Sequence, residues 1–486
     1  MSAAAGPAIR YQDCFVDGAW VGSDDRFDVV DPATGDVLAR APDLADDVVD
    51  RAIAAAHRAW AGWRAKPAPE RAAVLSAIAV AMRADERGLG ALITAENGKP
   101  LAEAVAEVRY AASFFEWFAG EAVRITGELV PAARADQRIV VTREPVGPCA
   151  LITPWNFPAA MLARKLAPAL AAGCTTVCKP AEQTPLTAFA MAAIAAAAGV
   201  PAGVINVVTG DARRVGALLL NDPRLRKISF TGSTEVGRIV LGAAAQRIAR
   251  VSCELGGNAP FVVLADADVE RAVAGAMVAK FRGGGQTCVA ANRFLVAAPV
   301  AEAFTAALAA RVAGLKVGRG TEPGVTVGPL IDDDGVAKVQ RLCADAIARG
   351  ARLVHGAVPD GRTRLVAPVV LADVTAAMAL WREEIFGPVI AIATVRDDDD
   401  AVAKANDTDA GLVAYVYGRD LERAARVAAR LDVGMVGINE GLISTAQAPF
   451  GGVKSSGYGR EGGHWGLDDY LATKYTMITL TPPEQS

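Results

Sequence analysis

The sequence predicts an α/β protein in which a doubly wound parallel sheet is joined to a second α/β lobe. Between residues 149 and 254, short apolar runs alternate with helical patterns, which is typical of parallel strands joined by crossover helices. After residue 255 the alternation restarts and continues to about residue 450. Because no long Ser/Gly or Pro linker separates the halves, we expect a large fixed interface with a cleft between the lobes.

Apolar runs predict the strands of each lobe. Those of the first are CALIT, TTVCKP, VINVVTG, RKISFTG and RVSCEL. The helix after the second run has clear ends, because Thr184 is a suitable cap, Pro185 takes the first helical position and Gly199 follows the end. In the second lobe we expect strands at APFVV and RFLVAA, with a helix to about residue 281 and a glycine-rich loop between them. The DDDD run at 397–400 predicts a solvated loop.

Other segments flank this core. We expect helices at 44–62, 69–95 and 100–120, followed by RITGELVPA and RIVVTREPVG as two β-like arms around a turn. The run LATKYTMITL alternates like a strand and has no obvious partner of its own. Because an exposed strand edge is usually covered, we expect it to pair with another subunit.

Composition excludes several classes of function. The 486 residues are 52% hydrophobic and 21% charged, and a formal charge of −4 leaves no basic surplus to attract nucleic acid or an anionic membrane. No membrane-spanning run or secretion signal is evident, so we expect a cytoplasmic protein. The seven cysteines are scattered and are expected to be reduced. Cys174 and Cys178 belong to a strand-like run and histidine is scarce, so we predict no metal site.

Two segments are candidates for dinucleotide binding. In FTGSTEVG a strand ends and Gly232 opens a helix, whose free N–H groups and positive dipole suit a pyrophosphate, with Ser233 adding a hydroxyl. By itself this motif is equally an ordinary turn. In KPAEQTP, Lys179 and Glu182 follow a strand end. A carboxylate accepts both ribose hydroxyls and repels a 2′-phosphate, so Glu182 favours NAD over NADP unless it is merely a solvated side chain. The GxGxxG beginning at Gly457 follows no predicted strand, which argues against phosphate binding.

Three residues are candidates for the chemistry. Cys288 ends the glycine-rich loop FRGGGQTC, and a nucleophilic thiolate requires an electropositive, partly exposed setting or a nearby base. Glu254 in ELGGNAP follows a strand and is a candidate base. Asn156 in PWNFP is a candidate oxyanion donor, together with the Cys288 N–H. Each has an ordinary alternative: a buried thiol, a salt-bridged acid and a turn asparagine.

Taken together, these motifs resemble the aldehyde dehydrogenase superfamily from DPATGDVLA to PFGGVKSSGYGREGG, with EEIFGPV also in family order. The resemblance implies that Cys288 is the nucleophile, Glu254 the general base and Asn156 the oxyanion donor. It implies an aldehyde dehydrogenase-like fold with a Rossmann-type cofactor domain, a second α/β catalytic domain and a small β oligomerisation arm. The implied cofactor contacts, with Glu384 on the nicotinamide ribose, are Thr153, Trp155, Lys179, Glu182, Gly232, Ser233, Leu255, Glu384 and Phe386.

The resemblance also implies a division of the chain and a homo-oligomer, either dimer or tetramer. The implied parts are an NAD-binding domain at 1–122 and 144–255, a catalytic domain at 256–455, an oligomerisation arm at 123–143 and 470–486, and a return segment at 456–469 that packs on the NAD-binding domain.

Within the family, NFPAAMLARK, FRGGGQTC and INEGLISTAQAPFGG are most similar to succinate-semialdehyde dehydrogenases. This implies that Arg164, Arg282 and Ser444 hold a distal carboxylate of a small aldehyde, a task that suits the arginine fork. Glutarate semialdehyde stays a rival substrate, because one methylene is worth only about 1–3 kcal/mol. A CoA-acylating dehydrogenase is less favoured, since such relatives usually lack the base, and a non-catalytic binding protein is a further alternative.

Two departures from the relatives' pattern affect the loop that ends in the nucleophile. Ala290 stands where some relatives have a second cysteine, so a disulfide switch is expected to be absent. Gly283 and Gly284 replace an asparagine and a small residue, so we expect a more mobile loop and a broader substrate preference.

Overall fold

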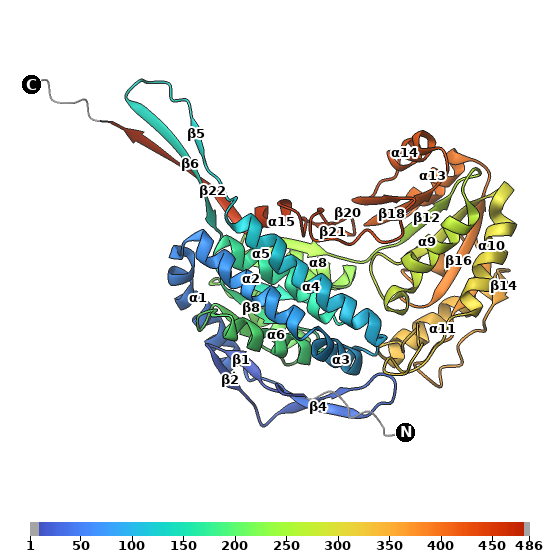
Figure 1. The fold of residues 1–486 in the computed structure, drawn as a ribbon, viewed down its shortest axis with the longest axis horizontal. Coiled ribbons are helices and arrows are strands. Elements are labelled where there is room, and N and C mark those ends of the chain that lie inside the picture. The colour runs from blue at the N-terminus through green and yellow to red at the C-terminus, as the bar shows by residue number, and fades with distance from the viewer. Residues whose placement is uncertain (1–8, 481–486) are drawn as a thin grey trace, which may run out of the picture.

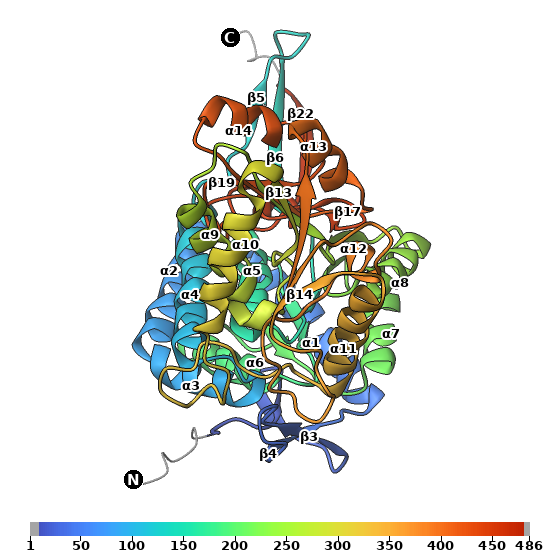
Figure 2. The ribbon, with the colours of Figure 1, turned by 90° about the vertical axis from the view of Figure 1, so that its right-hand side faces the viewer.

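Two large β-sheets, each covered by helices, form the body of the molecule (Figure 1, Figure 2). The computed structural model describes residues 9–480. The ends of two predicted parts, 1–8 and 481–486, lie outside the described residues. None of the described helices is both long enough and apolar enough to cross a membrane.

The first sheet contains the predicted parallel strands. Its order is β2-β1-β9-β8-β7-β10-β11-β21. These strands are β1 (Cys14–Val16), β2 (Ala19–Val21), β7 (Cys149–Ile152), β8 (Thr176–Lys179), β9 (Ile205–Val207), β10 (Lys227–Thr231), β11 (Arg250–Glu254) and β21 (Gly457–Tyr458). β7 to β11 run parallel, which confirms the predicted sheet. The chain adds β8 and β9 on one side of β7 and then places β10 on its other side. The carboxyl ends of β7 and β10 therefore form the switch point where open α/β sheets bind ligands.

Crossover helices join these strands. They are α5 (Pro158–Ala172), α6 (Leu186–Ala197), α7 (Ala212–Asn221) and α8 (Thr234–Gln246). The predicted cap of α6 is wrong, because Thr184 makes no capping bond. Instead, the carboxylate of Glu96 accepts the N–H groups of Leu186 at 2.8 Å and Thr187 at 3.0 Å. A buried carboxyl group supplied by another helix thus satisfies two of the free N–H groups at this helix end.

Four helices precede the β-arm (Figure 1): the first packs against β8, β9 and α7, and the other three pack over the crossover helices α5 and α6. They are α1 (Asp46–Ala65), α2 (Ala68–Ala84), α3 (Glu86–Asn97) and α4 (Leu101–Ala122). The single helix predicted over 69–95 is wrong. The helical path breaks at Asp85, with φ −111° and ψ 28°. Gly90 then allows α4 to approach closely, because a Cβ there would lie 2.7 Å from Val105.

The second sheet has the order β14-β15-β16-β13-β12-β18-β19, with β14 the antiparallel edge strand. Its strands are β12 (Ala259–Val263), β13 (Ala291–Ala297), β14 (Arg352–His355), β15 (Val369–Ala372), β16 (Val389–Val395), β18 (Val413–Tyr417) and β19 (Met435–Ile438). Its helices are α9 (Val269–Phe281), α10 (Ala298–Ala313), α11 (Asp333–Ala348), α12 (Ala379–Arg382), α13 (Asp398–Asn406) and α14 (Leu421–Ala428). Alternate residues of β12 enter separate cores, Val262 on one face and Phe261 and Val263 on the other.

The expectation of a solvated loop at DDDD is wrong. Asp397 is the cap of α13 and accepts the N–H of Asp400 at 2.8 Å. The other three aspartates form the first turn of the helix. Acidic side chains are stabilising there because they face the positive end of the helix dipole.

A three-stranded arm projects from the body, in the order β22-β6-β5 (Figure 1). Its strands are β5 (Glu128–Val130), β6 (Gln137–Pro145) and β22 (Leu471–Thr479). The expectation that the C-terminal strand lacks a partner in its own chain is wrong, because β22 pairs with β6 along its whole length. No other strand of residues 9–480 pairs with the outer edges of β5 and β22. Two small sheets complete the fold: β3 (Arg26–Val30) with β4 (Val37–Pro42), and β17 (Ala410–Gly411) with β20 (Val453–Lys454).

Candidate active site

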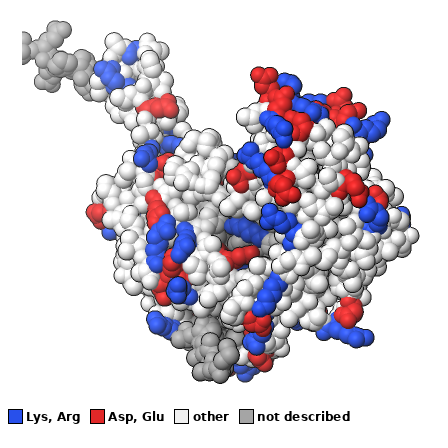
Figure 3. Space-filling model, turned by 45° about the vertical axis from the view of Figure 1, so that its right-hand side comes forward, with Lys and Arg blue, Asp and Glu red and all other residues white. Residues whose placement is uncertain are grey.

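A cavity of about 290 Å³ lies where the two sheets face each other, and eight of the predicted site residues line it. Those that follow strands of the first sheet are Trp155, Asn156, Gly232, Ser233 and Leu255, and those from the second lobe are Cys288, Glu384 and Phe386. Figure 3 shows one face of the molecule hollowed, with basic and acidic side chains next to each other in the hollow. The predicted cleft between the lobes is therefore present.

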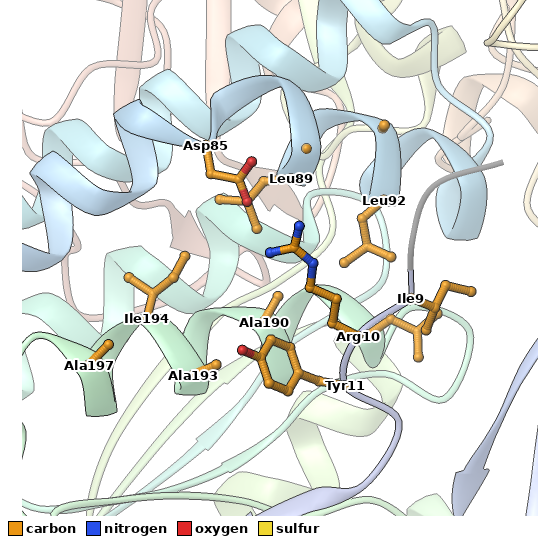
Figure 4. A pocket seen from close by; sticks show the side chains of 13 residues that line it. Ile9, Arg10, Tyr11, Asp85, Leu89, Leu92, Ala190, Ala193, Ile194 and Ala197 are labelled. Atoms are coloured by element: carbon orange, nitrogen blue, oxygen red, sulfur yellow. The ribbon is translucent and has the colours of Figure 1, made fainter. Parts of the chain in front are cut away.

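A second cavity, of about 270 Å³, lies on another part of the surface (Figure 4). The N-terminal segment at Arg10 and Tyr11, the start of α3 and helix α6 form its walls. Most of the described residues that line it are apolar, and among them only Arg10 and Asp85 carry a charge. None of the predicted catalytic residues lines it.

The backbone around Cys288 is fixed by glycines. Gly283, Gly284 and Gly285 have φ values of 60°, 63° and 79°, within the short helical turn η1 (Arg282–Gly285). A Cβ on Gly285 would lie 2.3 Å from the carbonyl oxygen of Gly387, so this position has no room for a side chain. The turn holds Cys288 half-buried at the cavity, whereas the six other cysteines are buried.

Burial raises the pKa of the Cys288 thiol to about 12, and the positive charge of Arg164 only partly offsets this effect. The negative charges of Glu384 and Glu254 raise it further. The thiol is therefore protonated at neutral pH. The predicted electropositive setting is supplied by Arg164 alone, so formation of a thiolate depends on a base close to the sulfur.

Glu254 ends β11 and is almost fully buried, opposite Gly457 of β21. No described residue donates a hydrogen bond to either of its carboxylate oxygens. Burial and the negative charge of Glu461 raise its pKa well above the ordinary value, although Arg164 and Lys165 lower it. A carboxyl group with a raised pKa and two free acceptor oxygens is suited to receive a proton.

Asn156 is held with its amide at the cavity. Its Nδ2 donates to the backbone carbonyl of Gln286 at 2.9 Å, and the backbone carbonyl of Asn156 accepts a bond from Nζ of Lys99 at 2.7 Å. One N–H bond of the amide therefore fixes the side chain to the loop that leads to Cys288. The second N–H is left for a ligand in the same cavity.

The switch point has the features of a nucleotide site. Ser233 caps α8 by accepting the N–H of Val236 at 3.3 Å, and the helix N-terminus faces the cavity. Across the cavity, Trp155 and Phe386 are in edge contact, with ring centroids 5.6 Å apart. Glu384 accepts the N–H of Gly257 at 3.0 Å, and burial raises its pKa to about 7. These groups fit a dinucleotide that lies across the carboxyl ends of β7 and β10.

The remaining predicted cofactor residues are at neighbouring strand ends. Thr153 follows β7, and its N–H donates to the carbonyl of Lys179 at 3.1 Å. Lys179 ends β8, and its Nζ lies 2.7 Å from Glu182, whose side chain is about one-third exposed. Neither charged side chain lines the cavity of Cys288. They lie at the same sheet edge, where the far end of an extended dinucleotide would reach.

A third cavity, of about 480 Å³, contains two of the predicted substrate residues. Nη1 of Arg282 lies 3.2 Å from Oγ of Ser444, and the guanidinium lies over the Phe157 ring at 4.7 Å. No ion pair of the described residues includes Arg282. Tyr110 also lines this cavity, and burial raises the pKa of its hydroxyl, although the positive charges of Arg164 and Arg282 partly offset this effect.

Arg164 is more deeply placed than predicted. It is 2% exposed, lies over the ring of Phe450 at 3.9 Å and forms an ion pair of 2.6 Å with Glu461. The ion pair is made by Nη2, whereas Nε has no hydrogen-bond partner among the described residues. Arg164 thus retains Nε as a donor, but its charge is shared with Glu461.

Sequence reasoning missed the buried ion pairs beside Glu254. Glu461 lies 2.5 Å from Lys165, which also donates to Ser229 at 3.2 Å. These side chains set the charge around the candidate base. Their only signal in the sequence was ordinary: a glutamate in a glycine-rich turn and a lysine within an apolar helix.

Comparison with known proteins reveals extensive similarity. Residues 20–476 match the model of the aldehyde dehydrogenase family. The chain is 49% identical to 3-sulfolactaldehyde dehydrogenase of Pseudomonas putida, over 97% of this chain and 98% of the relative. It is 50% identical to succinate-semialdehyde dehydrogenase (NADP+) of Escherichia coli strain K12, over 96% and 98%. Among solved structures, succinate-semialdehyde dehydrogenase from Burkholderia pseudomallei superposes with a TM-score of 0.95 at 50% identity, over 98% of this chain and 99% of that one.

Proposed function

Because the chain belongs to the aldehyde dehydrogenase family and is an NAD(P)-dependent oxidoreductase, we propose that it oxidises succinate semialdehyde to the acid by means of Cys288, Glu254 and Asn156. The observation that carries this proposal is the cavity where the two sheets face each other, which both Cys288 and Asn156 line. Glu254 does not line this cavity, but its negative charge is close enough to raise the pKa of the Cys288 thiol.

In the proposed mechanism, Glu254 accepts the thiol proton and the Cys288 sulfur forms a bond to the aldehyde carbon. The free N–H of Asn156 and the N–H of Cys288 donate to the resulting oxyanion. A nicotinamide cofactor held by Trp155, Glu384 and Phe386 would supply the hydride acceptor, and loss of hydride from this carbon would leave an acyl thioester on Cys288. Glu254 passes the thiol proton to solvent and, ionised again, deprotonates a water molecule that attacks the thioester carbonyl. When the C–S bond breaks, Glu254 returns its proton to the Cys288 sulfur, so the carboxylic acid leaves and the thiol is restored.

Substitution separates the two chemical steps. Cys288→Ala should abolish NADH formation while NAD still binds, whereas Cys14→Ala, in β1 of the first sheet, should leave turnover unchanged. Glu254→Gln should form NADH slowly and stall at the thioester, because the amide cannot accept a proton. Acyl-enzyme that accumulates on Cys288 can be detected by mass spectrometry. Retained turnover in Cys288→Ala, or steady-state turnover in Glu254→Gln equal to that of the wild type, would refute the respective assignment.

For the cofactor we propose NAD in preference to NADP. Ser233, the helix N-terminus beside Gly232, Leu255 and the Trp155–Phe386 pair support a dinucleotide at the switch point, with Glu384 at the nicotinamide ribose. Glu182 would accept the adenosine ribose hydroxyls and repel a 2′-phosphate, although Lys179 lies only 2.7 Å from it. Glu182→Gln should lower the KM for NADP and raise that for NAD. If the ratio of kcat/KM for the two cofactors does not change, Glu182 does not select between them.

For the substrate we propose that Arg282 and Ser444 bind the distal carboxylate. Arg164, which is more deeply buried, adds positive charge to this end of the site. Arg282 supports this role because it has no competing carboxylate within ion-pair reach. Arg282→Ala should raise the KM for succinate semialdehyde at least tenfold more than that for an unbranched aldehyde without a carboxylate; an equal effect would contradict the site. Arg164→Ala is a less specific test because it also removes a charge that Glu461 and Glu254 need. Glutarate semialdehyde is the second candidate substrate, because a cavity of about 480 Å³ also has room for one more methylene group. Both aldehydes therefore belong in the assay.

The arm supports a proposal on assembly. β5 and β22 are open edges, and apolar side chains on them, Leu129 at 78%, Tyr475 at 67% and Met477 at 47%, are exposed. We propose that the arm pairs with another copy of the chain to give a dimer or tetramer. Deletion of 126–143 or a Tyr475→Glu change should reduce the mass measured by light scattering; an unchanged mass would contradict it.

A further inference from the structure

The cavity that holds Arg282 also contains an acid that the proposed function does not use, Glu103 of α4. The neighbouring glutamate, Glu107, is fully engaged. It lies 2.5 Å from Lys99, and its other oxygen accepts the N–H of Ala159 at 2.9 Å. Among the ion pairs of the described residues, none includes Glu103 or Arg282. The cavity therefore contains one acidic side chain, Glu103, and one basic side chain, Arg282, neither of which has an ion-pair partner among the described residues.

Glu103 holds the glycine-rich turn. Its Oε2 accepts the N–H of Gly283 at 2.8 Å. Gly283 has a left-handed backbone conformation and no side chain that could fix it there by packing. Its surroundings are also loose, because a Cβ at this position would meet only the Phe157 ring, at 3.7 Å. The bond from Glu103 is thus a direct tether between α4 and the turn. The turn carries Arg282 at its start and leads through Gln286 to Cys288.

Glu103 also contributes charge. Glu103 and Arg282 line the same cavity. Burial raises the pKa of Glu103 above its ordinary value, and the N–H of Gly283 and the positive charges of Lys99 and Arg282 offset this effect only in part. At a pH above this raised pKa, the ionised carboxylate subtracts from the positive field that Arg282 offers to an anion. A singly charged head group can still bind to the guanidinium and the Ser444 hydroxyl, whereas a second negative charge is repelled by Glu103.

We propose that Glu103 is a positioning and charge-selecting residue, which tethers the Gly283 turn and restricts the Arg282 site to singly charged head groups. Carboxylates and sulfonates belong to this class, and doubly charged phosphonates and phosphate esters do not. The inference rests on the proposed function, because it requires Arg282 to hold the anionic end of the substrate.

The test uses unbranched aldehydes of matched length that end in carboxylate, sulfonate, phosphonate or methyl, assayed with NAD at pH 8. Sulfonate and phosphonate have nearly the same tetrahedral shape, so their comparison isolates charge. Glu103→Gln keeps an oxygen to accept the Gly283 N–H and removes only the charge. It should raise kcat/KM for the phosphonate about tenfold relative to the sulfonate, a modest share of one charge–charge interaction at protein-like dielectric, and leave the methyl-ended aldehyde unchanged.

Glu103→Ala removes the tether as well. It should show the same change in head-group selection, and in addition a fall of about tenfold in kcat for the methyl-ended aldehyde, because a loosened turn misplaces Cys288. Glu422→Gln, which neutralises a side chain that is 91% exposed in the second lobe, should change none of these ratios. Thermal melting of each variant identifies any loss of folding.

Each result has a separate meaning. If Glu103→Gln leaves the phosphonate-to-sulfonate ratio unchanged, charge selection is refuted. If Glu103→Ala turns over the methyl-ended aldehyde as fast as Glu103→Gln does, the tether is refuted. If the wild type does not prefer a carboxylate-ended aldehyde to a methyl-ended one, the proposed substrate class fails, and the methyl-ended assay still reports on the tether.

Discussion

Gly257 offers a sharp test of how tightly the nucleophile is positioned. A Cβ on Gly257 would lie 2.2 Å from the carbonyl oxygen of Cys288, about 1 Å short of the 3.4 Å at which ordinary contacts begin. The φ of Gly257 is not in the left-handed region, so alanine meets no backbone strain there and the clash alone decides the outcome. In Gly257→Ala the Cys288 backbone must therefore move by about 1 Å.

A displacement of this size should lower kcat/KM for the aldehyde about 100-fold. Overpacking should also reduce the free energy of unfolding by about 1–3 kcal/mol. Gly257 donates its N–H to Glu384, so the KM for the cofactor should rise as well. Steady-state NADH formation measures the fall in kcat/KM, and the rate of Cys288 alkylation by iodoacetamide reports the displacement of the thiol.

Gly216→Ala is the matched control. Gly216 lies within α7, and a Cβ there would meet nothing within 4 Å. This variant should keep full activity and gain about 1 kcal/mol of stability, since alanine favours a helix interior. If Gly257→Ala keeps kcat/KM within threefold of Gly216→Ala, the positioning argument is wrong.

Three further predictions concern buried charge and a helix end. Burial raises the pKa of Glu384 to about 7 from 4.5, so the folded protein holds this proton more tightly and loses stability as pH rises through that window. The Glu384→Gln variant lacks this titrating group and should avoid about 3 kcal/mol of the loss. It should therefore become more stable than the wild type as the pH rises from 5 to 8. Lys280 has a buried Nζ without a described partner and a pKa lowered to about 7 from 10.5, so here the unfolded chain holds the proton more tightly. Lys280→Met should stabilise by up to about 5 kcal/mol at or below pH 7, an advantage that disappears as pH approaches 10.5; equal melting temperatures at pH 6 would contradict it. Asp397→Ala should cost about 1 kcal/mol in chemical denaturation, because the cap of α13 is lost, and an unchanged midpoint would show that the cap is dispensable.

Local patterns predicted the elements that carry their own signal. The runs that become β7 to β11 are apolar and flanked by turns, so both their number and their parallel arrangement followed from the sequence. The same patterns placed Ser233 after β10 and Glu254 at the end of β11. Positions at strand ends are readable because parallel strands share one carboxyl edge.

The errors arise where distant residues decide local structure. Glu96 replaces Thr184 as the partner of the first N–H groups of α6, and this contact spans 90 residues. β22 finds its partner in β6, which lies more than 300 residues earlier in the chain. The break at Asp85 allows α3 to pack against α4. None of these contacts leaves a mark in a short window of sequence.

The candidate site shows the same limit in its charges. Motifs identified Cys288, Glu254 and Asn156, but a motif does not reveal burial, and burial is what raises the pKa values of the thiol and the carboxyl group. Arg164 was predicted as a substrate ligand, yet its ion pair with Glu461 also makes it part of the charge balance around Glu254. The predicted division into domains and the roles of the site residues stay predictions.

Several buried polar atoms at the candidate site have no hydrogen-bond partner among the described residues, and each of them lowers the stability of the folded protein. Oδ1 of Asn156, Nε of Arg164 and both oxygens of Glu254 belong to this group, and all lie around the candidate site. Each costs stability in the folded protein, since a buried polar group without a partner forfeits its hydration. Groups kept free in this way can bind a reacting molecule without first breaking a bond within the protein. It follows that changes which satisfy or remove them, such as Glu254→Leu, should raise the melting temperature and lower the activity together, and a variant that loses both would show that these atoms are held for folding instead.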